Sequence, residues 1–396
     1  MRKTLTFNCL DLISTLVFFS CINIPYIDIK IPWLPNVLSL LRIFLIFCFM
    51  ILLIKKKSLN FSKFFLLFNL MYLLLILTSM YYSRNLFYVF NTLSKSYLIV
   101  LFIELYLFNN DKILIILRRW KKLLLVLCIL DFISILMYPN GLYVEKNYTL
   151  NWFLGYKTAR MNYSFPLMYI STYIHIFTRE NKRINLYGIH TLCILTSFLS
   201  QATAATVALV TYSILLLLGL KTKFLNSKKT TYRFFNPNLL IIEFGILHAF
   251  ILFVETNKFI QYIVLNIFHK STTLSNRTII WENCIKYFLE NPIFGNGMLT
   301  PLEYINISGY FLGTSAHNYL ITLLVDGGIV VVVILYFMFI ETMARRRRIY
   351  NDKEITLIFS VISFMVLGLT SSTLVFATFS FLPFMLLENE KYLAKK

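Results

Sequence analysis

Long apolar segments recur along the whole chain. Stretches of about 20 mostly uncharged residues return from residue 7 to residue 388, and about 20 apolar residues in a helix suffice to cross a bilayer. Of the 396 residues, 58% are hydrophobic and only 14% are charged. An ordinary soluble domain carries roughly 25% charged residues. This composition excludes a soluble globular enzyme, a disordered chain and a fibrous repeat.

The apolar segments predict an all-α integral membrane protein with about twelve membrane-spanning helices. No small-residue cleavage site follows the first segment, so we expect a span there and not a cleaved signal peptide. The whole chain, 1–396, is expected to form a single multi-pass membrane domain. The predicted spans lie near 7–24, 36–54, 61–81, 86–108, 121–138, 161–178, 184–201, 203–220, 237–255, 317–341, 355–370 and 372–388.

The formal net charge of +20 comes from 38 Lys and Arg residues against 18 Asp and Glu residues. Most of the basic residues fall in every second connection, with clusters at 55–57, 118–122 and 345–348. Basic loops stay on the cytoplasmic side, so this alternation predicts twelve spans with both termini in the cytoplasm. We interpret the run at 345–348 as an anchor beside anionic lipid, and we expect no nucleic-acid binding.

Two of the predicted outer loops are long, at about 139–160 and 256–316. Long loops in compact proteins are usually functional. The apolar spacing in 259–267 indicates a short amphipathic helix within the second loop. A second helix is expected after Ser275 or Asn276, either of which could cap it, and it should end near residue 290.

A turn is predicted directly after this helix, over residues 292–297. It contains Pro292, Gly295 and Gly297, and both glycines permit a positive φ. The segment then leads back to the membrane at His317 and Asn318. The second outer loop is therefore expected to be partly helical.

Three residues at the predicted outer face are candidates for substrate binding or catalysis. Arg277 stands where a helix begins, and a guanidinium beside free backbone N–H groups suits a pyrophosphate; a surface Arg paired with a nearby Glu is the alternative. His317, at the mouth of a span, could take a proton from a hydroxyl, or it could simply reach the interface. Arg160 also lies at the outer face, as a binding residue or an interface anchor. The six cysteines and the other histidines show no metal-ligand spacing.

Three segments together resemble the O-antigen ligase/polymerase superfamily, and within it the Wzy-type polysaccharide polymerases. The family has an Arg-containing helix followed by a Pro-x-x-Gly-x-Gly turn, and this chain resembles it in SNRTIIWENCIKYFLENPIFGNGM. The family also has a His-Asn helix with a glycine eleven residues after the His, and this chain resembles it from His317 to Gly328 in SAHNYLITLLVDGGIVVVVILYF. A weaker similarity covers GYKTARMNYSFPLMY. The family's late acidic residue, often Glu, is Asp326 here. Many relatives have an Arg where this chain has Gln201; if that Arg serves a phosphate, Arg160 or Arg84 would replace it here, or the phosphate would be bound differently.

The resemblance implies a GT-C-like O-antigen ligase fold and a membrane glycosyltransferase that uses no metal and no cofactor. The enzyme would move a growing glycan from undecaprenyl diphosphate onto a new lipid-linked repeat unit at the outer leaflet of a bacterial plasma membrane, for capsule, exopolysaccharide or O-antigen. His317 would be the catalytic base. Arg160, Arg277, Asn318 and Gln201 would bind substrate. Membrane lipid is an expected partner, and a chain-length regulator protein stays open as another.

Three alternatives remain at this point. A glycan ligase would share the same motifs. A lipid-linked oligosaccharide flippase or transporter would also have about twelve spans, but it predicts related halves, and the sequence shows no internal repeat. A purely structural scaffold would not need His317.

Overall fold

The computed structural model describes residues 9–55, 61–144, 149–178, 183–221, 245–246, 277–311, 313–343, 352–369 and 377–393. The predicted span at 237–255, apart from 245–246, and the predicted helix within 259–267 lie outside these ranges. Each of the other predicted spans overlaps a helix. The helices are α1 (Cys9–Cys21), α2 (Pro25–Lys30), α3 (Leu34–Lys55), α4 (Lys63–Tyr81), α5 (Leu86–Tyr106), α6 (Asn110–Met137), α7 (Met161–Thr178), α8 (Arg183–Leu199), α9 (Thr203–Lys221), α13 (Arg277–Glu290), α14 (Pro301–Ser308), α15 (Tyr319–Met343), α16 (Asp352–Gly368) and α17 (Leu382–Leu393).

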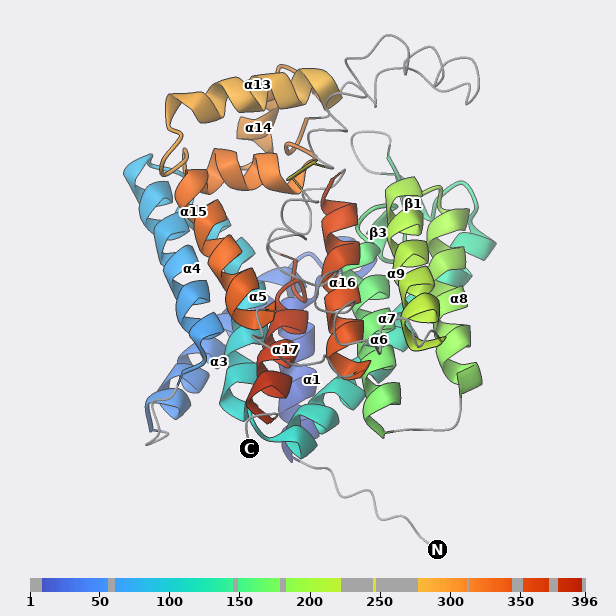
Figure 1. Ribbon diagram of the computed structural model, residues 1–396. Coiled ribbons are helices and arrows are strands. Elements are labelled where there is room, and N and C mark those ends of the chain that lie inside the picture. Colours follow the sequence, from blue (N-terminus) through green and yellow to red (C-terminus); the bar gives the residue numbers. More distant parts are fainter. Residues whose placement is uncertain are drawn as a thin grey trace, which may run out of the picture.

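Most of these helices stand side by side in an upright bundle, and α13 and α14 lie across one end of it (Figure 1). Within the described ranges, α3, α4, α5 and α15 are long and apolar enough to cross a membrane by length and composition. The bundle is therefore that of a membrane protein. Helix α1 begins, and α17 ends, at the end of the bundle opposite α13 (Figure 1). This arrangement is compatible with termini on one side; that this side is cytoplasmic stays a prediction.

Two helices differ from their predicted spans. Helix α6 begins at Asn110 and not near 121, because the side chain of Asn109 caps it by accepting a hydrogen bond from the Lys112 N–H at 3.1 Å. Helix α17 begins at Leu382 and not near 372. Before it, the Phe379 carbonyl accepts a hydrogen bond from the Tyr169 hydroxyl at 3.1 Å, and residues 378 to 381 form turns.

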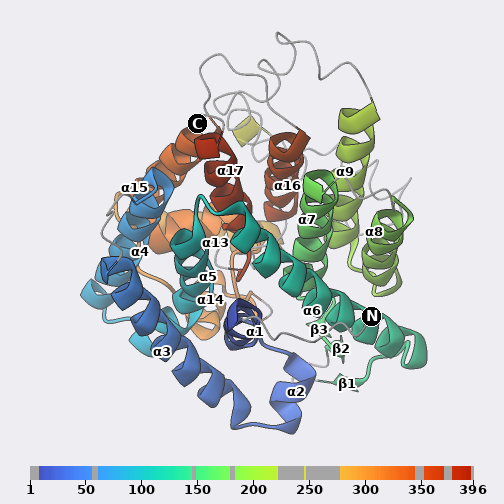
Figure 2. The same ribbon diagram turned by 90° about the horizontal axis from the view of Figure 1, so that it is seen from below.

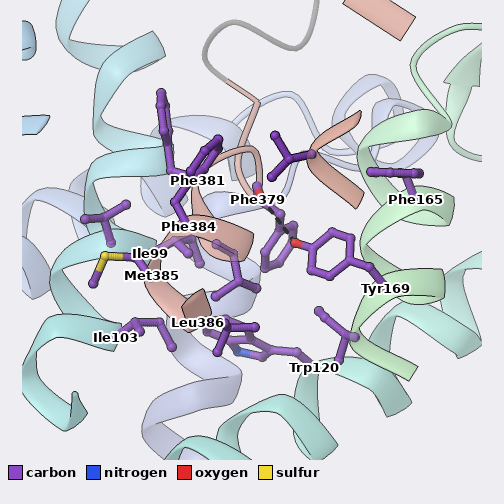
Figure 3. Packing of buried hydrophobic residues seen from close by; sticks show 14 of the residues in the cluster. Ile99, Ile103, Trp120, Phe165, Tyr169, Phe379, Phe381, Phe384, Met385 and Leu386 are labelled. Atoms are coloured by element: carbon purple, nitrogen blue, oxygen red, sulfur yellow. Dashed lines mark hydrogen bonds between the residues drawn. The ribbon is translucent and has the colours of Figure 1, made fainter. Parts of the chain in front are cut away.

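The short helix α17 lies in the middle of the bundle core. Figure 3 shows Phe381, Phe384 and Met385 pointing into a cluster that also contains Ile99 of α5 and Trp120 of α6. All five side chains are buried. Lipid tails are as apolar as these side chains, so the helices associate through close packing more than through exclusion of water.

A small antiparallel sheet covers part of the end of the bundle that α13 occupies. Strand β1 (Tyr143–Val144) pairs with β2 (Leu150–Trp152), and β2 pairs with β3 (Gly155–Tyr156). The all-α prediction is correct for the bundle and wrong for this outer loop. Strands of two or three residues are too short to show an alternating pattern in the sequence.

Helix α15 is broken at Gly328, whose φ of 66° and ψ of −170° fall in a region that is essentially restricted to glycine. The part before Gly328 lies across the end of the bundle, beneath α13, and the part after it runs down the bundle beside α4 (Figure 1). The glycine that the sequence places eleven residues after His317 therefore sets the bend between the outer layer and the membrane helix.

The predicted turn at 292–297 fills this break. Gly295 and Gly297 have φ angles of 72° and 73°, which confirms the predicted turn. The Pro292 carbonyl accepts a hydrogen bond from the Ile329 N–H at 2.9 Å, and the Asn296 N–H donates to the Val325 carbonyl at 2.8 Å. Backbone groups at membrane depth need internal partners, and the turn supplies them where the helix cannot.

Replacing Gly328 by Ala is expected to destabilise the protein by about 2–4 kcal/mol. The added Cβ would lie 2.3 Å from the Ile293 carbonyl oxygen, and the backbone would leave its favoured region. The measurement is the free energy of unfolding of the purified protein in mixed micelles. Gly188→Ala, in α8 with nothing within 4 Å of the added Cβ, is the control and should not destabilise the protein. Equal stability of the two variants would contradict this account.

Candidate functional site

The outer layer has a small hydrophobic core of its own, formed by α13, α14 and the first part of α15. Ile280, Trp281, Cys284, Tyr304 and Val325 are buried in it. Burial raises the pKa of the Cys284 thiol to about 12, so this cysteine stays a neutral filler at physiological pH. The layer is therefore a folded unit and not a loose loop.

Arg84, in the connection between α4 and α5, fastens this layer to the bundle. Its Nε donates to the Asn296 carbonyl at 2.8 Å and its Nη2 to the Tyr287 hydroxyl at 2.7 Å. Its Nη1 pairs with Glu303 at 2.9 Å. Sequence reasoning named Arg84 only as a substitute phosphate ligand. Each guanidinium nitrogen is instead used to hold the outer layer in place.

Glu303 belongs to the cap of α14. Its carboxylate accepts hydrogen bonds from the backbone N–H and the hydroxyl of Thr300, and the Thr300 hydroxyl accepts one from the Glu303 N–H. Burial alone would raise the pKa of Glu303. The hydrogen bonds from Thr300 and the charge of Arg84 outweigh burial and hold this pKa below its usual range.

His317 lies in the short segment that leads into α15. It is partly exposed and has a φ of 49°, an uncommon angle for a residue with a side chain. Its backbone N–H donates to the Ser315 hydroxyl at 3.3 Å. Strained backbone of this kind tends to cluster at active sites and ligand clamps.

The first turn of α13 lies close to the His317 segment. Trp281, one turn after Arg277, donates from its indole N–H to the carbonyl of Ala316 at 2.7 Å. Arg277 is partly exposed and is the first described residue of α13. A helix is present from Arg277 onward, and its Trp281 contacts Ala316, the neighbour of His317. The predicted caps, Ser275 and Asn276, lie outside the described residues.

Asn318 holds the start of α15. Its side-chain oxygen accepts a hydrogen bond from the Ile321 N–H at 3.1 Å, and its side-chain nitrogen donates to the Leu369 carbonyl at 3.2 Å. The residue is 3% exposed. In this structure Asn318 therefore caps α15 and ties it to the end of α16, beside His317.

Arg160 lies on the α6–α7 side of the bundle, beneath the small sheet. It is 1% exposed, and its Nε is 2.7 Å from a carboxylate oxygen of Asp131. Its guanidinium carbon is 4.6 Å from the ring centre of Trp152. Among the described residues, Nη1 and Nη2 are buried without a hydrogen-bond partner. Arg160 is thus held by an ion pair that the sequence did not reveal, because Asp131 belongs to a different helix.

Gln201 lies at the turn between α8 and α9. It is exposed and has a φ of 57°, and its N–H donates to the Phe198 carbonyl at 2.9 Å. No described hydrogen bond joins it to α13 or α15. The structure thus gathers Arg277, His317 and Asn318 in one region and places Arg160 and Gln201 on other elements.

An apolar cavity of about 230 Å³ lies between α15, α16 and α17. Its lining includes Tyr319 and Leu320, which follow Asn318 directly, and Phe339 and Phe384 further into the bundle. The cavity wall is almost free of polar atoms. Such a space suits a hydrocarbon chain. One of its lining residues, Tyr319, follows His317 by two positions in the chain.

Residues 189–337 match the family model of the O-antigen ligase. This match to part of the chain supports a place in the O-antigen ligase/polymerase superfamily. The matched stretch contains Gln201, Arg277, His317 and Asn318, whereas Arg160 lies before it. Comparison with curated proteins and with solved structures gives no match.

Members of the O-antigen ligase family are glycosyltransferase-like membrane enzymes that act on lipid-linked oligosaccharides. The matched stretch runs from α8 to beyond the break in α15, so it includes α13, α14 and the bend at Gly328. The family domain therefore contains the outer layer together with the membrane helix on which the layer rests.

The docking of the outer layer is expected to weaken at acidic pH. Because the pKa of Glu303 is lower in the folded state than in the unfolded state, its stabilising contribution is complete above the unfolded pKa and is lost as the pH falls through the folded pKa. Hydrogen exchange of peptides from α14 should therefore accelerate as the pH falls, after correction for the intrinsic rate. Glu303→Gln should exchange quickly at every pH. The exposed Glu282→Gln in α13 serves as the control and should behave like the wild type.

Proposed function

We propose that the chain is a polysaccharide polymerase. It transfers a growing glycan from undecaprenyl diphosphate onto a new lipid-linked repeat unit at the outer face of a bacterial plasma membrane. The observation that carries the proposal is the position of His317: it lies on strained backbone, next to the first turn of α13 and above an apolar cavity.

His317 acts as the general base. The imidazole accepts the proton of an acceptor hydroxyl as the oxygen attacks the anomeric carbon of the donor glycan. A new glycosidic C–O bond forms, and the bond between the anomeric carbon and the phosphate oxygen breaks. Undecaprenyl diphosphate leaves with the electron pair. The donor phosphate bond provides the driving force, so no nucleotide is consumed.

The leaving diphosphate needs a positive partner as its charge develops. Arg277 fits this role because a guanidinium near the N-terminal end of a helix adds its charge to the positive end of the helix dipole, which also attracts anions. The proposal needs no metal. Arg160 keeps two buried guanidinium nitrogens free for a second phosphate contact, which would require the sheet above it to move. Gln201 is assigned a hydrogen bond to a sugar.

The polyprenyl tail of the donor is assigned to the cavity between α15, α16 and α17. Tyr319 and Leu320 place the upper end of this cavity beside Asn318 and His317. A tail held there would position the attached diphosphate near the outer layer. Fixing the reacting groups in this way lowers the barrier by removing the entropy of bringing them together.

Replacing His317 by Ala is expected to reduce polymer formation at least 100-fold, because a positioned base typically contributes a factor of about 10²–10⁴. The readout is the length ladder of lipid-linked glycan made by cells that carry only the variant, with membrane insertion verified by immunoblot. Phe311→Ala, an exposed side chain in the same segment, is the control and should leave the ladder unchanged. Normal chain length in correctly inserted His317→Ala protein would refute the assigned base.

Replacing Arg277 by Gln is expected to slow transfer by a factor of about 100, by loss of charge at the leaving group. Arg277→Lys should recover part of the rate, because the ammonium keeps the charge but not the paired geometry. Initial rates with purified donor and acceptor lipids measure both effects. The matched control is Lys286→Gln, which removes an exposed charge from the same helix. Equal losses for Arg277→Gln and Lys286→Gln would argue against a specific contact.

A glycan ligase is the second candidate, and the description of the matched family favours it. The two functions leave different products when the protein is absent. Loss of a polymerase leaves single lipid-linked repeat units, whereas loss of a ligase leaves finished lipid-linked polymer that is never transferred. Linkage analysis and a size ladder from a deletion strain therefore decide between them. A chain-length regulator protein would act only on a polymerase.

A further inference from the structure

Arg42 of α3 is a buried cation that has no carboxylate partner among the described residues. It is 2% exposed. Its Nη1 donates to the Ser20 carbonyl at 2.9 Å, and its Nη2 donates to the Ser39 hydroxyl at 3.0 Å and to the side-chain oxygen of Asn91. These acceptors are neutral and come from α1, α3 and α5. Among the described residues, its Nε has no hydrogen-bond partner.

A second cation lies beside it. Lys95 follows Asn91 by one turn of α5, so both residues face α3. Lys95 is close enough to Arg42 for the two charges to repel, and Asp28 of α2 acts on Lys95 more weakly than Arg42 does. In the part of the chain that the structure describes, Lys95 forms no hydrogen bond or ion pair.

The pair lies in the half of the bundle nearest the outer layer. Helix α5 begins at that end, because Arg84, just before it, contacts Asn296 and Glu303. Lys95 is the tenth residue of α5 and Arg42 the ninth of α3, which puts them roughly 12–14 Å below the helix starts. This depth is within reach of lipid head groups for long basic side chains.

The surroundings of the pair are open to lipid. Ser39, Asn91 and Lys95 are partly exposed, and Leu40 and Ile43 of α3 are 68% and 59% exposed. Figure 2 shows α1, α3 and α5 as neighbours on the side of the bundle away from α8 and α9. None of these residues lines the cavity between α15, α16 and α17.

A purely structural role explains only part of this cluster. Arg42 does satisfy a carbonyl in the last turn of α1, where carbonyls lack helical partners. Lys95 makes no such contact, and a second unpaired cation beside the first is unfavourable in a membrane unless an anion joins them. Two cations facing one space are the arrangement that binds a phosphate.

We propose that Arg42 and Lys95 bind the phosphate of an anionic lipid between α1, α3 and α5, at the level of the outer head groups. The phosphate could belong to a phospholipid or to the diphosphate of a polyprenyl lipid. If the proposed polymerase function holds, this site suits the second lipid-linked glycan, because that reaction needs two lipid diphosphates at once. The lipid-phosphate site itself does not depend on that function.

The test measures binding and not transfer. The full-length protein is purified in a neutral detergent, and native mass spectrometry counts the copies of added undecaprenyl diphosphate, phosphatidylglycerol or inorganic pyrophosphate that remain bound. R42Q/K95Q should lose one lipid-phosphate copy, with at least tenfold weaker retention. K95Q alone should weaken retention several-fold, and it leaves the contacts of Arg42 with α1 and α5 in place. K30Q, an exposed Lys in α2, is the matched control and should bind as the wild type does.

Each outcome decides the matter. Loss of undecaprenyl diphosphate alone in K95Q supports a substrate site, and equal loss of phosphatidylglycerol supports a general lipid-phosphate site. Unchanged retention of both lipids, or retention of inorganic pyrophosphate alone, overturns the proposal. His317→Ala should keep this lipid copy in every case, so failure of the proposed polymerase function would not be mistaken for failure of this site.

Discussion

The break in α15 is the constraint on which the outer layer depends. A helix that bends leaves backbone N–H and C=O groups without their helical partners, and such groups need other partners when they are buried. The turn at 292–297 satisfies them with its own carbonyl and N–H groups, and two glycines permit the close approach. The bend directs the first part of α15 across the bundle, where α13 packs on it. The position of His317 is therefore a consequence of how one helix is broken.

The arginines at the outer end of the bundle have different roles. Arg84 makes three contacts that hold the outer layer on the bundle, and Arg160 is buried in an ion pair with Asp131. Arg277 stands at a helix start beside the His317 segment. A guanidinium can join two parts of a fold or bind a substrate, and the groups around it decide which. Under the proposed function, Arg277 provides the charge nearest the reaction.

Some features of the site were readable from the sequence because they are local. The helix that contains Arg277 and the turn with Gly295 and Gly297 both follow from the order of neighbouring residues, and the structure contains both. The pairing of Arg160 with Asp131 and the clamp made by Arg84 were not readable. Their partners are 29 and more than 200 residues away, and a single sequence does not say which distant side chains meet.

By itself, the sequence determined the membrane-protein class, most of the helices and the motifs that place the chain in its family. These depend on apolar length and on short-range spacing, which a linear chain displays directly. Only the tertiary structure decided where the spans end, that a small sheet covers Arg160, and that a turn is inserted into the break in α15. It also decided that Asn91 of α5, one turn before Lys95, meets Arg42 of α3. Those features arise from packing between helices that are distant in the chain, where the fold and not the local pattern selects the partner.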